Sequence, residues 1–235
     1  MNARLRLMAH GLVLALSASG CSRPGTPPAG GPVPVAEEPR HRPVFRNAIA
    51  SVLDVRVAAG DTTGYHTHAA RNVGETIESA RTWAQPWGGS PGSIQPAGGV
   101  GELFDNWSQS LPYTHRVGNA DPRPFHYVVG EWLGTSGRAC KAPTDDGSRR
   151  VVKEGSQFQV IEVRLAPHTD TAPHTHACPG LLVLASDGAL VENGSTAVAR
   201  GGSGAGTWVW HDADHQHTLR NTGDAPLLVF EIDWK

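Results

Sequence analysis

The tetrapeptide His-Thr-His-Ala occurs twice in this chain of 235 residues, at 66–69 and at 174–177. The similarity extends upstream, because 52–69 and 160–177 align without gaps and are identical at nine of 18 positions. Two histidines at i and i+2 of an extended strand point to the same face, so both imidazoles can reach one metal ion. A duplicated segment of this length predicts two structurally similar halves.

A second pair of matching segments lies downstream. Residues 115–125 and 217–227 share a histidine, an asparagine four positions later and a proline. The third histidine follows the His-x-His pair by 47 residues in the first copy and by 41 in the second. We expect Asn119 and Asn221 to cap turns through their side-chain amides. The candidate metal ligands are His66, His68 and His115 in the first copy, and His174, His176 and His217 in the second.

The local pattern indicates β-structure throughout both halves. Residues 52–57 and 158–165 alternate and are rich in β-branched side chains, which is typical of strands. The 28 glycines and 18 prolines interrupt the chain every few residues, and no amphipathic helix of three turns is evident. The sequence therefore predicts the all-β class, with two sandwiches or barrels joined by a loop around 134–150.

On these residues the chain resembles the cupin superfamily. The opening of its first motif, Gly-(x5)-His-x-His, is matched by 60–68, and the end of its second, His-(x3)-Asn, by 115–119. The second copy repeats both, with His168 in the place of the glycine. The resemblance covers about 45–235 and implies two double-stranded β-helix (jelly-roll) barrels in tandem, a bicupin. It implies an N-terminal cupin domain over 43–135, a linker loop over 136–150 and a C-terminal cupin domain over 151–235.

The chain departs from the family pattern at the metal-binding glutamate. That residue should fall near Asn72 or Val73 in the first copy and near Gly180 or Leu181 in the second, and none of these is a carboxylate. Both sites are therefore expected to be three-histidine sites. Glu75 lies two positions further along, where it would face the ligands or solvent. The acids nearest to the first site along the chain are Glu75, Glu102 and Asp105, and no catalytic residue is assigned.

Three imidazoles favour a divalent transition metal over magnesium or calcium. Iron is the first expectation, with zinc, nickel, manganese or copper as alternatives. Three protein ligands leave coordination positions open, as in catalytic sites, and some cupin dioxygenases use three histidines. The resemblance thus implies an iron dioxygenase acting on a small organic substrate. A non-catalytic module that binds a metal or a small ligand, and a metal-dependent isomerase or hydrolase, remain open, so enzymatic activity itself is undecided.

The remaining histidines and two arginines have less specific signals. His215 shares strand parity with His217 and would be a fourth ligand on a continuous strand, but the polar run at 211–217 favours a turn with an exposed His215. His126 and His211 are expected at the surface or in packing, and His168 in solvent. Arg56 and Arg164 could bind an anionic substrate. The favoured interpretation is that each faces outward or forms a structural ion pair with a carboxylate.

The N-terminal segment resembles a bacterial lipoprotein leader. Arg4 and Arg6 precede an apolar run and small residues before Cys21, although Ala18 stands where that class usually has leucine. We expect a signal peptide with a lipobox over 1–21 and a Pro/Gly-rich tether over 22–42. The protein would be exported to the periplasm or anchored to the outer membrane as a lipoprotein, with free secretion as the alternative.

The partners and the cysteines follow from this localisation. The membrane would be contacted only through a lipidated Cys21. A net charge of −2 gives no case for nucleic acid, so the expected partner is a small-molecule ligand or substrate, with oligomerisation left open. Export implies an oxidising compartment, in which Cys140 and Cys178 can form a disulfide. Metal ligation by Cys178, or a buried thiol, are the rival interpretations.

Overall fold

The computed structural model describes residues 31–141, 143, 147–192, 195–196 and 204–235. The expected signal peptide, Cys21 and the first part of the expected tether lie outside the described residues. Within the described part of the chain, no helix has both the length and the apolar character needed to cross a membrane.

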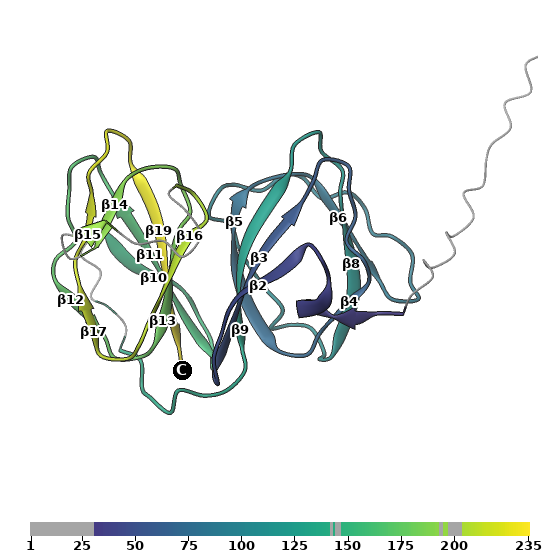
Figure 1. Cartoon of the computed structure of the whole chain (residues 1–235), viewed down its shortest axis with the longest axis horizontal. Coiled ribbons are helices and arrows are strands. Elements are labelled where there is room, and N and C mark those ends of the chain that lie inside the picture. The colour runs from purple at the N-terminus through teal and green to yellow at the C-terminus, as the bar shows by residue number, and fades with distance from the viewer. Residues whose placement is uncertain (1–30, 142, 144–146, 193–194, 197–203) are drawn as a thin grey trace, which may run out of the picture. The chain divides into compact units, whose positions relative to one another are not determined.

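The first half forms a barrel of two sheets, seen at the right of Figure 1. One sheet has the order β1-β4-β8-β6 and the other the order β2-β3-β9-β5-β7. A short 3-10 helix, η1 (Val35–Glu37), connects β1 to β2. The strands are β1 Val33–Pro34, β2 His41–Arg46, β3 Ala50–Val57, β4 His66–His68, β5 Arg71–Glu78, β6 Thr82–Pro86, β7 Leu103–Asp105, β8 Tyr113–Asn119 and β9 Phe125–Trp132.

The second half repeats this arrangement with one wall divided in two. Its sheets have the orders β10-β11-β19-β13-β16, β12-β17 and β15-β14-β18. No sheet of the described strands combines members of both halves, and the all-β jelly-roll prediction is confirmed. The strands are β10 Arg149–Glu154, β11 Phe158–Leu165, β12 His174–His176, β13 Gly180–Leu184, β14 Leu190–Glu192, β15 Ser195–Thr196, β16 Thr207–His211, β17 His215–His217, β18 Leu219–Asn221 and β19 Leu227–Trp234.

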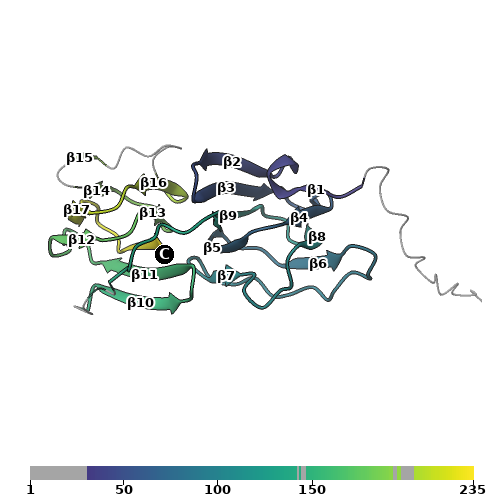
Figure 2. The same cartoon turned by 90° about the horizontal axis from the view of Figure 1, so that it is seen from below.

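The central strands are buried on both faces, which explains their nearly continuous apolar sequences. In β3, Leu53 belongs to the core inside its own barrel, whereas Val52 belongs to a core shared by both barrels. The equivalent strand β11 divides in the same way, with Ile161 inside its barrel and Val160 in the shared core. The His-bearing pairs β4–β8 and β12–β17 lie on the sides away from this shared core (Figures 1 and 2).

The expected tether over 22–42 is too long, because residues 33–42 belong to the folded barrel. Val33 and Pro34 pair in parallel with the start of β4, and Val35 is buried in the barrel core. Proline is compatible with a two-residue edge strand because such a strand needs few backbone donors. Composition alone therefore did not show that residues 33–42 belong to the barrel.

Cys140 and Cys178 form a disulfide, which decides among the three interpretations of Cys178. The bond attaches the segment after β9 to the residue that lies two positions past His176. Arg138 supports the same attachment, since its Nη1 donates to the Ala177 carbonyl at 3.3 Å and pairs with Asp214 at 2.7 Å. The domain limits at 135, 136, 150 and 151 remain predictions.

Asn119 and Asn221 cap equivalent turns, as expected. The Asn119 amide donates to the carbonyls of Val57, Ala58 and Arg123 at 2.8–3.1 Å. The Asn221 amide donates to the carbonyls of Leu165, Ala166 and Ala225 at 2.8–3.2 Å. Asn119 thus fastens β8, which carries His115, to the end of β3, and Asn221 fastens β18, which follows the His217 strand, to the end of β11.

Candidate metal centres

The three histidines expected in the first copy lie together. β4 and β8 are antiparallel neighbours, and His66 is directly opposite His115. The ring centroids are 4.6 Å apart for His66 and His115, 5.1 Å for His66 and His68, and 5.2 Å for His68 and His115. The Nε2 atoms of His68 and His115 are 3.2 Å apart. That they bind a metal remains a prediction.

A fourth histidine, His41, joins this group from β2, and sequence reasoning missed it. Its ring centroid lies 4.1 Å from that of His66, and the ligand atoms of His41, His66 and His68 all lie within 4.8 Å of one another. It was missed because it falls in the segment assigned to the tether. We call His41, His66, His68 and His115 the first centre.

Hydrogen bonds at Nδ1 direct the opposite ring nitrogens into the first centre. His66 Nδ1 donates to the Gly64 carbonyl at 3.0 Å, and His41 Nδ1 lies 2.7 Å from the Glu38 carboxylate. The Nε2 atom of His66 is buried and has no hydrogen-bond partner among the described residues. A buried nitrogen lone pair without a donor is costly, and a bound cation would satisfy it, so the first centre fits a metal ion.

The surroundings keep the imidazoles of His66, His68 and His115 neutral, which is the protonation state that binds metal ions. Burial, together with neighbouring imidazoles, lowers the pKa of His66 to about 3, of His68 to about 2 and of His115 to about 4. Burial alone would raise the pKa of Glu38, but hydrogen bonds from His41 and from a backbone amide outweigh it and lower the pKa to about 2. The first centre thus has one charged carboxylate behind it and none facing it.

A cavity of about 350 Å³ opens onto the first centre beside His41, His68 and His115. Its other walls are mainly apolar and aromatic, and include Trp83, Phe104, Tyr113, Phe125 and Tyr127. Tyr113 also contacts a ligand, since its ring centroid is 4.7 Å from that of His115. This volume is typical of a small-molecule pocket.

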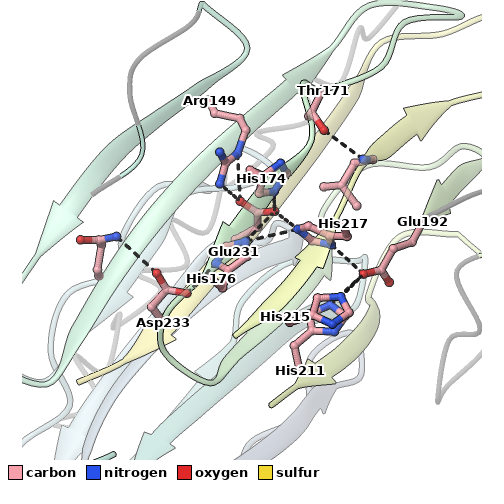
Figure 3. A network of polar contacts seen from close by, with 12 residues as sticks. Arg149, Thr171, His174, His176, Glu192, His211, His215, His217, Glu231 and Asp233 are labelled. Atoms are coloured by element: carbon pink, nitrogen blue, oxygen red, sulfur yellow. Dashed lines mark hydrogen bonds and ion pairs between the residues drawn. The ribbon is translucent and has the colours of Figure 1, made fainter. Parts of the chain in front are cut away.

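The three histidines expected in the second copy also lie together, and a carboxylate joins them (Figure 3). Oε1 of Glu231, on β19, lies 3.1 Å from His174 Nε2, 3.3 Å from His176 Nε2 and 3.1 Å from His217 Nε2. Tetrahedral ligands bound at about 2.0–2.1 Å are separated by roughly 3.3 Å. We call these four residues the second centre. It departs from the three-histidine expectation because the carboxylate comes from the barrel wall instead of the first motif.

The second centre is a network of charges. Burial would raise the pKa of Glu231, but hydrogen bonds from the three histidines hold it well below its usual range. Arg149 pairs with the same carboxylate at 2.9 Å. Burial lowers the pKa of His176, but Asp233 and Glu231 outweigh burial and raise it to about 9. A polar cavity of about 380 Å³, lined in part by Lys141 and Arg149, reaches this group at His174 and His176.

The two centres differ at two positions that change together. His41 pairs with Val55 and Arg149 with Val163, so they are equivalent by the offset of 108 between β3 and β11. Val129 pairs with Leu53 and Glu231 with Ile161, so these are equivalent as well. His41 and Val129 of the first copy are therefore replaced by the ion pair Arg149 and Glu231 in the second.

The structure also shows where the other residues considered in the sequence lie. Glu75 faces neither the ligands nor solvent, because its ladder partner Val128 belongs to the shared core. The exposed turn expected for His215 is wrong, because His215 begins β17 and faces Glu192. His211 is buried beside His215. The remaining residues have structural partners: Arg56 pairs with Asp54, Arg164 with Glu162, buried His126 with Asp54, and exposed His168 with Asp224.

The sequence matches no protein-family model and no curated protein. Among solved structures, AerE from Microcystis aeruginosa is similar with a TM-score of 0.56 and 11% identity, over 84% of this chain and 98% of that one. Salicylate 1,2-dioxygenase from Pseudaminobacter salicylatoxidans has a TM-score of 0.53 and 12% identity, over 79% and 71% of the two chains. Oxalate decarboxylase from Lactobacillus farciminis has a TM-score of 0.53 and 12% identity, over 80% and 77%.

Identities this low are informative about the fold alone. The dioxygenase and the decarboxylase are cupin-fold proteins, and each half of this chain brings the histidines of both cupin motifs together on paired strands. The chain therefore has the fold of the cupin superfamily, in two tandem copies.

Proposed function

We propose that this protein is a metal-dependent cupin oxygenase that oxidises a small, mainly apolar organic substrate at the first centre. The observation that carries the proposal is the apolar cavity of about 350 Å³ that opens directly onto the imidazole cluster. Oxygenase activity also agrees with the fold shared with a salicylate dioxygenase.

His41, His66, His68 and His115 would hold the metal through nitrogen atoms. Imidazole suits iron, zinc, nickel and copper, and four ligands leave two positions free on a six-coordinate ion. Iron remains the first choice, with manganese, zinc, nickel or copper as alternatives. When bound, such an ion would supply the oxygen chemistry that the side chains of this chain lack.

The protein itself would bind and orient the substrate. Trp83, Phe104 and Tyr127 provide apolar surface for an aromatic or aliphatic body. Burial raises the pKa of Tyr113, so its hydroxyl stays protonated and can donate a hydrogen bond to a substrate oxygen near His115. The same walls exclude water from the reacting atoms.

The second centre supports a different role within the same chain. Its three histidines and one carboxylate would fill all four positions of a tetrahedral ion, as in a structural zinc site. We propose that the C-terminal barrel binds its metal without turnover and that the N-terminal barrel carries the activity.

The proposed function is tested by metal content and oxygen uptake of the full chain purified without a histidine tag. We expect a redox-active metal and oxygen consumption with some members of a panel of phenols and small aromatic acids. His66→Ala should remove the metal of the first centre and all oxygen uptake, whereas the exposed His168→Ala should keep both. Full metal content in His66→Ala would contradict the assignment, and metal without uptake on any substrate would indicate a binding module.

Export as a lipoprotein is also proposed, on the leader-like sequence and on the disulfide, which is stable in oxidising compartments. The protein should partition with membranes, and Cys21→Ala should release it to the soluble fraction. Soluble wild-type protein in the same fractionation would contradict lipidation.

A further inference from the structure

A second group of metal-binding side chains lies behind the second centre. It consists of Glu192 on β14, His211 on β16 and His215 on β17, and their ligand atoms together with a nitrogen of His217 lie within 4.8 Å of one another. Figure 3 shows Glu192 and His215 on the side of His217 that faces away from Glu231.

The contacts within this group converge on one carboxylate oxygen. Glu192 Oε1 lies 2.8 Å from His215 Nε2, 3.3 Å from His211 Nε2 and 2.6 Å from His217 Nδ1. The rings of His211 and His215 are stacked, with centroids 3.9 Å apart and planes within 9°. Two imidazole nitrogens and a carboxylate therefore face the same small volume.

One of these nitrogens makes no hydrogen bond to the described residues. The His211 side chain is nine-tenths buried, and its Nε2 makes no hydrogen bond among the described residues, although it lies near Glu192. His66 Nε2 in the first centre is likewise buried without a hydrogen bond to the described residues. An ion could reach the group from solvent past His215, whose side chain is 29% exposed.

The first barrel has different residues at the positions equivalent to this group. Register places Glu192 opposite Leu219 and His215 opposite His176, and the corresponding residues of the first copy are Ala84 and Tyr113. His211 pairs with Gly180, the equivalent of Asn72, which bonds to Asn106. Ala84, Asn106 and Tyr113 all line the apolar cavity of about 350 Å³. A Glu-His-His group thus fills the space that is a ligand cavity in the other copy.

We infer that Glu192, His211 and His215 form a third metal centre, which binds a divalent transition cation with a preference for imidazole ligands. His217 connects it to the second centre, because its Nε2 faces Glu231 at 3.1 Å and its Nδ1 faces Glu192 at 2.6 Å. Glu192 therefore also orients the His217 ring, as carboxylates behind metal-bound histidines commonly do. The inference is independent of the activity proposed for the first centre.

The test counts zinc bound per chain in the full-length, untagged protein. The protein is stripped with a chelator, reloaded with Zn²⁺, desalted and analysed for metal. The double variant His211→Ala/His215→Ala should bind one equivalent less than the unmodified protein, and His168→Ala should bind the same amount. A variant of the first centre, His66→Ala, loses a different equivalent, so failure of the proposed function is distinguishable from failure of this inference.

An unchanged zinc count in the double variant would overturn the inference. If that variant does not fold, as judged by its thermal unfolding, Glu192→Gln retains the side-chain size and should also lose zinc. Crystals of the unmodified protein grown with Zn²⁺ give a further reading. An anomalous peak between Glu192 and His211 supports the third centre, and its absence where the second centre is occupied overturns it.

Discussion

At the scale of single residues, two exchanges separate the centres. The first barrel has His41 and Val129 where the second has Arg149 and Glu231, so only the second places a carboxylate among the histidines. Imidazole ligands would leave the charge of a bound cation undiminished, which would favour anionic or oxygen-containing ligands in its open positions. The carboxylate of the second centre would neutralise part of that charge and supply a fourth ligand.

His41 should depend on Glu38, the carboxylate that holds its ring. We expect Glu38→Gln to weaken metal binding at the first centre by about 10–100-fold, the usual effect of losing such a partner, with the second centre unaffected. Competition with a chromogenic chelator measures both affinities. The neighbouring exposed Glu37→Gln is the charge-matched control, and equal affinities in the two variants would show that His41 is not a ligand.

At the scale of elements, the turns capped by Asn119 and Asn221 are repeated in both copies, and each stabilises its own barrel. Asn221 satisfies three carbonyls at the junction of β11 and β18, and Asn119 does the same between β3 and β8. Since the third histidine of each centre lies four residues before the asparagine, the turn also fixes the position of a ligand strand.

Asn221→Ala should lower the free energy of unfolding by about 2–3 kcal/mol, because buried carbonyls lose their donors. Asn221→Asp keeps the oxygen that accepts from the Gly223 amide at 2.9 Å but not the donor group, and should be destabilised at least as much. Urea unfolding measures both, with Asn119→Ala as the equivalent change in the first barrel. Wild-type stability of Asn221→Asp would mean that the donated hydrogen bonds contribute little.

The sequence predicted the elements that carry repeated motifs and failed where a ligand comes from the barrel wall. Alternation and the offset of 108 located β3, β11 and the two His-x-His strands. His41 and Glu231 reach their centres across the barrel, and no local spacing encodes a contact between distant strands. A signal existed for Glu231, because Glu231 and Asp233 share the parity of inward-facing Val229 in an otherwise apolar strand.

At the scale of the whole folded region, the two barrels are stabilised by a common apolar core. Trp234 lies so close to the first barrel that a Cβ atom at Gly130 would be 2.5 Å from its ring, and its Nε1 donates to the Glu131 carbonyl at 3.4 Å. The apolar runs of β3 and β11 indicated in the sequence that both faces of these strands are buried. They did not indicate that the second face packs against the other barrel. The carboxyl group of Glu75 also lies at this core, because its ladder partner Val128 belongs to it.

Glu75 should make the stability of the protein fall as pH rises. It is fully buried without a hydrogen-bond partner among the described residues, and burial raises its pKa well above the ordinary 4.5. The folded state therefore binds this proton more tightly than the unfolded chain does. The contribution of this proton to the free energy of unfolding is complete below pH 4.5 and is lost as pH rises toward the folded pKa, at up to about 1.4 kcal/mol per pH unit.

Glu75→Gln removes the titrating group, so urea unfolding between pH 4.5 and 8 should show the stability of the variant rising relative to that of the unmodified protein. Glu78→Gln, at the exposed end of the same strand, should follow the wild-type profile, and parallel profiles for Glu75→Gln would place that carboxyl in contact with water.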